Sequence, residues 1–149
     1  MKLTIASDHR GFQAKERMKS FLAELGHETA DFGTDSTKSC DYPDFAYPAV
    51  KAVAEGEAER GILFCGTGIG MSIAANKVRG VRAALCYDEV SVDMARRHND
   101  VKILCLPADL LAEKQMTKII RIFLEAPFDG GRHLRRVDKL SKIENGQNP

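Results

Sequence analysis

An apolar run that leads directly into a glycine-rich turn constrains the fold of this chain more than any other segment. Residues 61–65 read Gly-Ile-Leu-Phe-Cys, and Gly66, Gly68 and Gly70 follow at alternate positions before a helix-like stretch at 71–76. A buried strand, a tight turn and a helix in this order form part of a βα unit. Such a turn exposes backbone N–H groups at the positive end of the helix dipole, so it favours an anion or a developing oxyanion.

The rest of the chain repeats this alternation of strands and helices. We expect strands over residues 2–7, 27–32, 61–65, 81–87 and 101–106, and helices over residues 11–25, 41–55, 71–76, 88–98, 110–124 and 134–143. Repeated βα units favour a mostly parallel sheet that is covered by helices on both faces. The sequence therefore predicts an α/β fold, a Rossmann-like three-layer α/β/α sandwich with five parallel strands, in one domain over residues 1–149.

The composition argues against several classes of function. The formal net charge of the chain is +1, which predicts no nucleic-acid partner. No apolar stretch approaches the roughly 20 residues of a membrane span, and the first six residues lack the longer apolar core of a signal peptide. The four cysteines form no CxxC pair, which favours reduced thiols. We therefore expect a cytoplasmic protein with no membrane partner.

Reactive side chains follow the ends of the expected strands. Asp8 and His9 come after the first strand, Tyr42 follows the second after a loop, Cys65 ends the third, and a His-Asn pair at 98–99 ends a helix. Sites in parallel sheets lie beyond the carboxyl ends of the strands, so we expect these residues to gather there. Each also has a structural interpretation. Asp8 can cap a helix, Tyr42 can lie in a turn, Cys65 can be a small buried side chain, and residues 98–99 can be a plain helix C-terminus.

The glycine loop fails to match three familiar anion-binding patterns. A dinucleotide fingerprint requires a third glycine where this chain has Met71. A P-loop requires a lysine after its last glycine, and a tyrosine-phosphatase loop requires an arginine six residues after its cysteine, but Met71 occupies both positions. What remains is an anion pocket lined by backbone amides, beside a cysteine whose place before a helix favours thiolate character.

A second basic segment contains two arginines four residues apart. It reads Gly-Gly-Arg-His-Leu-Arg-Arg at 130–136. Residues at i and i+4 share a helical face, so Arg132 and Arg136 can converge on a phosphate monoester. A solvated basic helix explains them equally well. If this helix does not reach the glycine loop of its own subunit, the site is completed across a dimer interface. His27 and His133 carry little independent signal, and we expect them at the surface.

Six motifs, taken together and in order, resemble a known family. They are Ser-Asp-His-Arg-Gly-Phe at 7–12, Asp-Tyr-Pro at 41–43, Cys-Gly-Thr-Gly-Ile-Gly at 65–70, Ala-Ala-Asn-Lys at 74–77, Arg-His-Asn-Asp at 97–100 and Gly-Gly-Arg-His at 130–133. Over essentially its whole length the chain resembles type B ribose-5-phosphate isomerases. The wider family includes galactose-6-phosphate isomerase subunits and enzymes that act on allose 6-phosphate. Some members have serine in place of the cysteine and a glutamate base elsewhere, so Cys65 places the resemblance in the cysteine branch.

The resemblance implies interconversion of D-ribose 5-phosphate and D-ribulose 5-phosphate, within the pentose phosphate pathway and without a metal or an organic cofactor. The sugar ring opens first, and a cis-enediolate then forms and is reprotonated on the neighbouring carbon. Cys65 would be the base that removes the carbon-bound proton. The loop amides would stabilise the enediolate oxygen, which assigns substrate contacts to Gly66, Gly68, Ile69 and Gly70.

The resemblance also implies roles for the other motif residues. His98 would serve as acid and base in ring opening, with Asp8 and Thr67 as helpers. The remaining substrate contacts divide between the phosphate, held by His9, Arg132 and Arg136, and the sugar hydroxyls, held by Tyr42 and Asn99. The family shares each site between two subunits of a homodimer, with a tetramer as the alternative. His98 and Asn99 would then come from the partner of the chain that supplies Cys65.

Three other functions remain open on the sequence. An isomerase of a six-carbon sugar phosphate would use the same motifs with a longer pocket. A phosphate- or nucleotide-binding module without catalysis would need only the glycine loop and the arginines, and it gives no reason for Cys65, His98 and Asp8. A redox protein would use Cys65, although the chain offers no CxxC partner for it.

Overall fold

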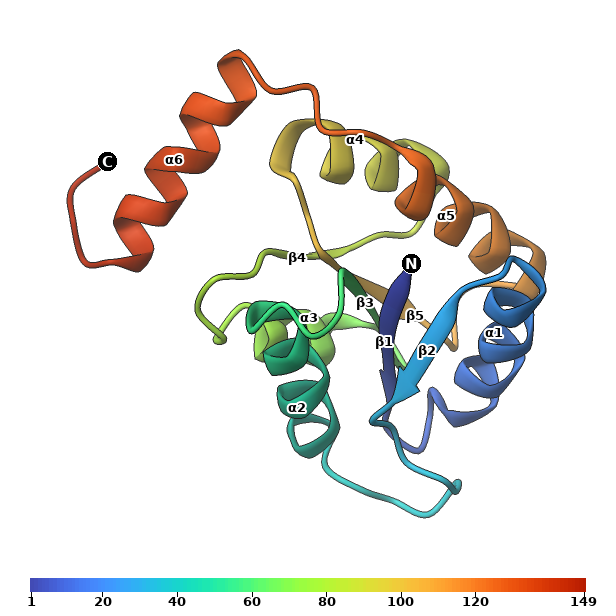
Figure 1. Cartoon of the computed structure of the whole chain (residues 1–149). Coiled ribbons are helices and arrows are strands. Elements are labelled where there is room, and N and C mark those ends of the chain that lie inside the picture. Colours follow the sequence, from blue (N-terminus) through green and yellow to red (C-terminus); the bar gives the residue numbers. More distant parts are fainter.

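The computed structural model describes all 149 residues, and its strands and helices alternate along the chain (Figure 1). The strands are β1 (Lys2–Ser7), β2 (Glu28–Asp31), β3 (Arg60–Cys65), β4 (Ala83–Leu85) and β5 (Ile103–Pro107). The helices are α1 (Phe12–Glu24), α2 (Tyr42–Ala54), α3 (Ile69–Ala75), α4 (Glu89–Asn99), α5 (Glu113–Glu125) and α6 (Arg132–Glu144). The predicted order of elements is confirmed, with shifted boundaries.

The five strands form one parallel sheet in the order β2-β1-β3-β5-β4. Between β1 and β3, Ile5 pairs with Ile62 and Ser7 pairs with Phe64. The chain passes from β1 to β2 on one side and then crosses to the other side of β1 for β3. The direction of the strand order therefore changes between β1 and β3, and ligands of open parallel sheets bind beyond the carboxyl ends of the strands at such a point.

Helices cover both faces of the sheet, which confirms the predicted three-layer α/β/α architecture (Figure 1). On one face α1, α4 and α5 enclose a cluster of 18 buried residues that includes Phe64. On the other face α2 and α3 cover a cluster of 13 buried residues that includes Cys65 and Met71. Successive side chains of a strand point to opposite faces, so the last two residues of β3 enter different layers. Cys65 thus lies on the side of α2 and α3.

Strand β4 is shorter than the expected range of 81–87, since only Ala83, Ala84 and Leu85 pair with β5. On its outer side a side chain takes the place of a neighbouring strand. The Asn76 side-chain amide donates to the carbonyl oxygen of Ala83 at 3.0 Å and accepts from the Ala83 N–H at 3.0 Å. Since β4 is an edge strand, its outer backbone groups have no strand to pair with. Asn76, from the Ala-Ala-Asn-Lys motif, therefore closes this edge of the sheet.

Helix α6 extends away from the three layers (Figure 1). His133 and Val137 are buried beneath it, whereas three of its large apolar side chains are exposed: Leu134, Leu140 and Ile143. Its last turn is tied to the loop after α3, because Arg79 donates to the Glu144 carbonyl at 2.8 Å and the Gly80 N–H donates to the Glu144 carboxylate at 2.9 Å. The reach of α6 toward a partner subunit stays a prediction. None of the helices has the length and apolar character that crossing a membrane requires.

Candidate active site

The thiol of Cys65 ends β3 and lies against the turn that follows it. Cys65 is only 5% exposed, and its Sγ accepts a hydrogen bond from the Gly68 N–H at 3.2 Å. Gly68 precedes α3 with a φ of 76°, in the left-handed region that side chains rarely adopt. Glycine at this position therefore lets the turn fold back far enough to bring an N–H onto the sulfur.

The turn leaves several backbone donors free. The Ile69 N–H donates to the Thr67 hydroxyl at 3.4 Å, and the Gly68 N–H donates to the thiol. No oxygen or sulfur of the chain accepts a hydrogen bond from the N–H groups of Gly66, Thr67 and Gly70. Free amides at a helix start are suited to a substrate oxygen that gains negative charge.

At two positions of the loop only glycine fits, because other side chains lie too close to leave room for a Cβ atom. A Cβ at Gly70 would lie 2.8 Å from the Tyr42 ring. A Cβ at Gly66 would lie 2.7 Å from a carboxylate oxygen of Asp109 and 2.8 Å from Nε of Arg10. The glycines thus let Tyr42 and an Arg10–Asp109 ion pair close over the loop.

Asp8 is held at the end of β1 by the turn that leads into α1. Its side chain is 6% exposed, and its Oδ1 accepts from the N–H groups of Arg10 at 2.9 Å and Gly11 at 3.0 Å. Asp8 therefore fixes the turn before α1, whereas the residue that precedes the helix itself is Gly11. A Cβ at Gly11 would lie 2.6 Å from the Phe64 carbonyl oxygen, so this turn packs directly on β3.

A cavity of about 200 Å³ lies at the switch point of the sheet. Its lining consists of six of the predicted site residues and an unexpected arginine: Asp8, Arg10, Tyr42, Cys65, Gly66, Thr67 and Gly70. The side chains that follow β1, β2 and β3 therefore gather at the carboxyl edge of the sheet. Sequence reasoning did not single out Arg10. Its place directly after Asp8 and His9 was the only signal that could have pointed to it.

His9 lies at the same edge, held by the loop before α2. The Cys40 N–H donates to Nδ1 of His9 at 3.2 Å, and the Cys40 Sγ lies 3.8 Å from the same nitrogen. Because Nδ1 is an acceptor here, a neutral His9 carries its proton on Nε2. Nε2 is then free to donate to a ligand.

His98 and Asn99 do not line this cavity within one chain, and their contribution from a partner subunit stays a prediction. They end α4, and the chain then turns into the amino end of β5, with Arg82 donating to the Asn99 carbonyl at 2.7 Å. Helices of βα units run antiparallel to the strands, so the end of α4 lies at the opposite edge of the sheet from Cys65. A six-residue strand such as β3 separates the two edges by about 16 Å.

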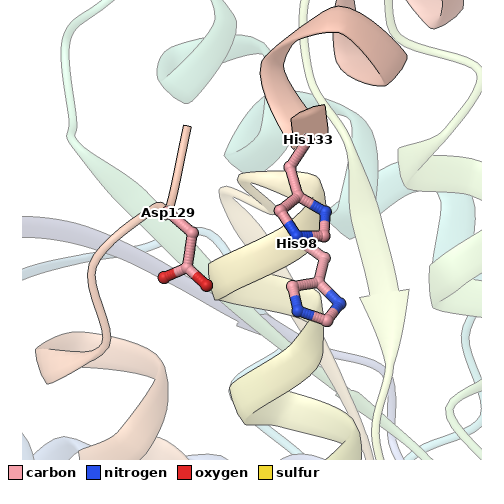
Figure 2. A group of neighbouring side chains, drawn as sticks. All are labelled: His98, Asp129 and His133. Atoms are coloured by element: carbon pink, nitrogen blue, oxygen red, sulfur yellow. The ribbon is translucent and has the colours of Figure 1, made fainter. Parts of the chain in front are cut away.

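A second cluster forms at this amino edge around two histidines (Figure 2). The His98 and His133 rings stack with centroids 4.0 Å apart and 6° between their planes. Beside them, Asp129 is paired with Arg97 at 3.1 Å. Burial, together with the charges of His98 and Arg132, lowers the pKa of His133, although the Asp129 carboxylate opposes this shift.

The expectation of a surface position for His133 is wrong, since it is 7% exposed. Val137 is apolar and follows His133 by four residues, so both lie on one face of the helix. This spacing was the signal that His133 faces inward. On the same helix, Arg132 and Arg136 are exposed, and no carboxylate pairs with either. Their guanidinium groups therefore remain available for an anion at the amino edge.

The same histidines must be tested as metal ligands. His98, Asp129 and His133 offer ligand atoms within 4.8 Å of one another. Imidazoles that share a metal direct their lone pairs at one point, whereas these rings are almost parallel. The carboxylate is paired with Arg97, and Nε of Arg132 lies 3.4 Å from Nε2 of His133. Neighbouring guanidinium groups disfavour a cation here, so the cluster fits an anion better.

Several known proteins are similar to this chain in sequence and in fold. Residues 3–140 match the ribose/galactose isomerase family. Ribose-5-phosphate isomerase B of Escherichia coli (strain K12) is 40% identical over 147 residues, which cover 99% of each chain. The structure of ribose-5-phosphate isomerase B of Clostridium thermocellum superposes with a TM-score of 0.96 at 46% identity, covering 98% of this chain and 99% of that one. The structure of ribose-5-phosphate isomerase B of Mycoplasma genitalium with bound ribulose-5-phosphate superposes with a TM-score of 0.93 at 39% identity. The match covers 97% of this chain and 96% of that one. The chain therefore belongs to the ribose/galactose isomerase family, and it is an isomerase.

Proposed function

We propose that this chain interconverts D-ribose 5-phosphate and D-ribulose 5-phosphate, in the cytoplasm and within the pentose phosphate pathway. The ribose-5-phosphate isomerases B among its relatives support this substrate. The observation that carries the proposal is the surroundings of Cys65. A nearly buried thiol lies beside the free N–H groups of Gly66, Thr67 and Gly70. This is the pairing of a base with an oxyanion site that aldose–ketose isomerisation requires.

In the proposed reaction the Cys65 thiolate takes the proton from C2 of the open-chain aldose. The electrons of that C–H bond form a C1–C2 double bond, and the C1 carbonyl oxygen gains the negative charge. Cys65 then returns the proton to C1, while the proton on O2 moves to O1 and leaves the ketone at C2. Asp8 and Thr67 line the same cavity, where they are placed to relay the oxygen-bound proton. The loop amides stabilise the enediolate, and one such donor typically contributes about 100- to 1000-fold in rate.

Ring opening and phosphate binding need groups that one chain does not bring to this cavity. His98, Asn99, Arg132 and Arg136 lie at the amino edge, and the proposal places them in the site of a second copy of the chain. Each homodimer then has two sites, each with Cys65 from one subunit and His98 from the other. In this arrangement the arginines, with His9, hold the phosphate, and Asn99 and Tyr42 contact the sugar hydroxyls.

The exposed apolar side chains support a dimer that adjoins the cavity. Helix α3 begins at the glycine loop and exposes Ile69 and Ile73 by about half of their surfaces, at 50% and 55%. Three more exposed apolar residues lie on α6: Leu134, Leu140 and Ile143. Apolar patches of this kind mark protein–protein contacts. A contact that buries α3 would bring the amino edge of the partner toward the Cys65 cavity.

A coupled assay decides between the candidate functions. The purified protein is tested with ribose 5-phosphate, allose 6-phosphate and galactose 6-phosphate, each with and without EDTA. The proposal expects the highest kcat/KM for ribose 5-phosphate and no effect of EDTA. A higher kcat/KM for a six-carbon sugar phosphate would reassign the substrate. No isomerisation together with tight nucleotide binding would instead identify a binding module.

A further inference from the structure

We propose that Arg10 is a substrate-binding residue that holds the phosphate group from the same chain as Cys65. This inference rests on the proposed function, since it concerns the sugar phosphate of that reaction. Arg10 is the only cationic residue that lines the Cys65 cavity. Of the other groups assigned to the phosphate, His9 lies at the same edge of the sheet but does not line the cavity, and Arg132 and Arg136 lie at the opposite edge of the same chain.

The position of Arg10 is fixed at both ends of the residue. Its backbone N–H donates to the Asp8 carboxylate at 2.9 Å. Its guanidinium pairs with Asp109, whose own N–H donates to the Gly66 carbonyl at 3.0 Å. The pair therefore spans the loops after β1 and β5 and lies over the first glycine of the turn. Arg10 is anchored at the entrance of the cavity and is not a freely moving surface arginine.

The space for this guanidinium exists because residue 66 has no side chain. A Cβ there would come within 2.8 Å of Nε of Arg10. From that distance and the standard spacing of Cα atoms, Nε lies within about 8 Å of the Cys65 Cα. A ribose 5-phosphate molecule is about this long between its reacting carbon and its phosphate, so one ligand can contact both residues.

The exposure gradient across the cavity orients the ligand. Cys65 is 5% exposed, whereas the Arg10 side chain is 61% exposed. The reacting carbons must approach the buried thiol, which leaves the strongly hydrated phosphate at the open rim. There the guanidinium keeps further N–H donors for the phosphate, since the pair with Asp109 is made through Nη2 and a guanidinium carries five N–H groups.

The charges of the cavity make a cation necessary. Without Arg10 the lining would carry the Asp8 carboxylate and, in the proposed mechanism, the Cys65 thiolate. Both groups repel a phosphate dianion. A guanidinium offsets this repulsion and matches phosphate with parallel N–H donors, a geometry that lysine cannot reproduce.

The experiment compares Arg10→Met with a matched control, Arg17→Met. Arg17 forms an ion pair too, an exposed one between α1 and α5 with Glu113 at 3.0 Å, but it does not line the cavity. Binding of inorganic phosphate is titrated by phosphorus NMR, and kcat and KM are measured with ribose 5-phosphate and with ribose. Removal of a charge-assisted hydrogen bond to phosphate should weaken phosphate affinity by about tenfold or more.

The expected result is that Arg10→Met raises the Kd for phosphate and the KM for ribose 5-phosphate by about tenfold or more. The kcat of Arg10→Met and its activity on ribose stay within about threefold of wild type. Arg17→Met has the phosphate Kd and the KM of wild type. Arg10→Lys has values of both constants between those of wild type and Arg10→Met. Equal phosphate Kd values for Arg10→Met and Arg17→Met would overturn the inference, as would equal losses on ribose and ribose 5-phosphate. If Arg10→Met does not fold, Arg10→Gln replaces it. The wild-type assay alone decides the proposed function, whereas the phosphate titration decides the role of Arg10 without turnover.

Discussion

The backbone N–H of Gly68 points at the Sγ of Cys65 and donates to it at 3.2 Å. A hydrogen bond of this kind is stronger to a thiolate than to a thiol. The sulfur is also kept from water, since Cys65 is nearly buried among the residues under α2 and α3. The loop thus holds one sulfur in one place, which is what a base needs in order to return a proton to the neighbouring carbon.

Replacement of the sulfur tests the base. Cys65→Ala should lower kcat by about 100-fold or more, because a positioned general base typically contributes 100- to 10,000-fold. The variant should still bind ribose 5-phosphate in calorimetry, since the loop amides and the basic groups are untouched. A Cys65→Ala enzyme with wild-type kcat would show that another group removes the proton.

Gly68 can be tested separately from the sulfur. Gly68→Ala should lower the free energy of unfolding by more than about 1 kcal/mol, because an alanine strains the left-handed backbone and its Cβ meets the Leu106 carbonyl carbon at 3.2 Å. It should also lower kcat, since the N–H that faces Cys65 moves. Gly80→Ala is the matched control, with a φ of +85° and nothing within 4 Å. Equal losses of stability and unchanged kcat in both variants would contradict the proposed role of this turn.

The proposed sharing of sites between subunits has a quantitative signature. Cys65→Ala and His98→Asn chains should each be inactive alone. In a randomly mixed population half of the dimers are heterodimers, and each of these regains one intact site from Cys65 of one chain and His98 of the other. The mixture should therefore recover about one quarter of wild-type activity per dimer. A mixture as inactive as its components would place both residues in the same chain's site.

The sequence indicated most of this fold because each strand and helix carries its own local pattern. The length of β4 was missed, since it depends on which residues find partners in β5, which is distant in sequence. Within the site, Asp8 and Cys65 follow from strand ends alone. Arg10 does not, because its direction is set by Asp109, which is distant in sequence and adjacent only in the fold. The end of a helix, unlike the end of a strand, does not reach this edge within one chain, so the strand pattern alone could not place His98.

An ion pair between a buried lysine and a partly exposed aspartate gives a stability prediction. Lys15 is 2% exposed, and its Nζ lies 2.6 Å from the Asp31 carboxylate. Burial alone would raise the pKa of Asp31, but hydrogen bonds from Lys15 and Lys19 lower it. Asp31→Asn leaves the Lys15 charge with only Glu16, so urea unfolding should show a loss of about 3 kcal/mol. Lys15→Met combined with Asp31→Asn should recover most of this loss. A double variant as unstable as Asp31→Asn would rule out the uncompensated charge as the cause.

The stacked histidines predict how stability depends on pH. The pKa of His133 is lowered by burial and by the charges of His98 and the nearby arginines, whereas an unfolded chain has a histidine pKa of about 6.5. The unfolded state then binds the proton more readily, so this contribution to stability is present above about pH 6.5 and is lost as the pH falls through the lower folded value. His133→Phe keeps an aromatic ring against His98 without the titration. Urea unfolding from pH 7.5 to 5 should show a steeper decline for wild type than for His133→Phe, and parallel declines would contradict the prediction.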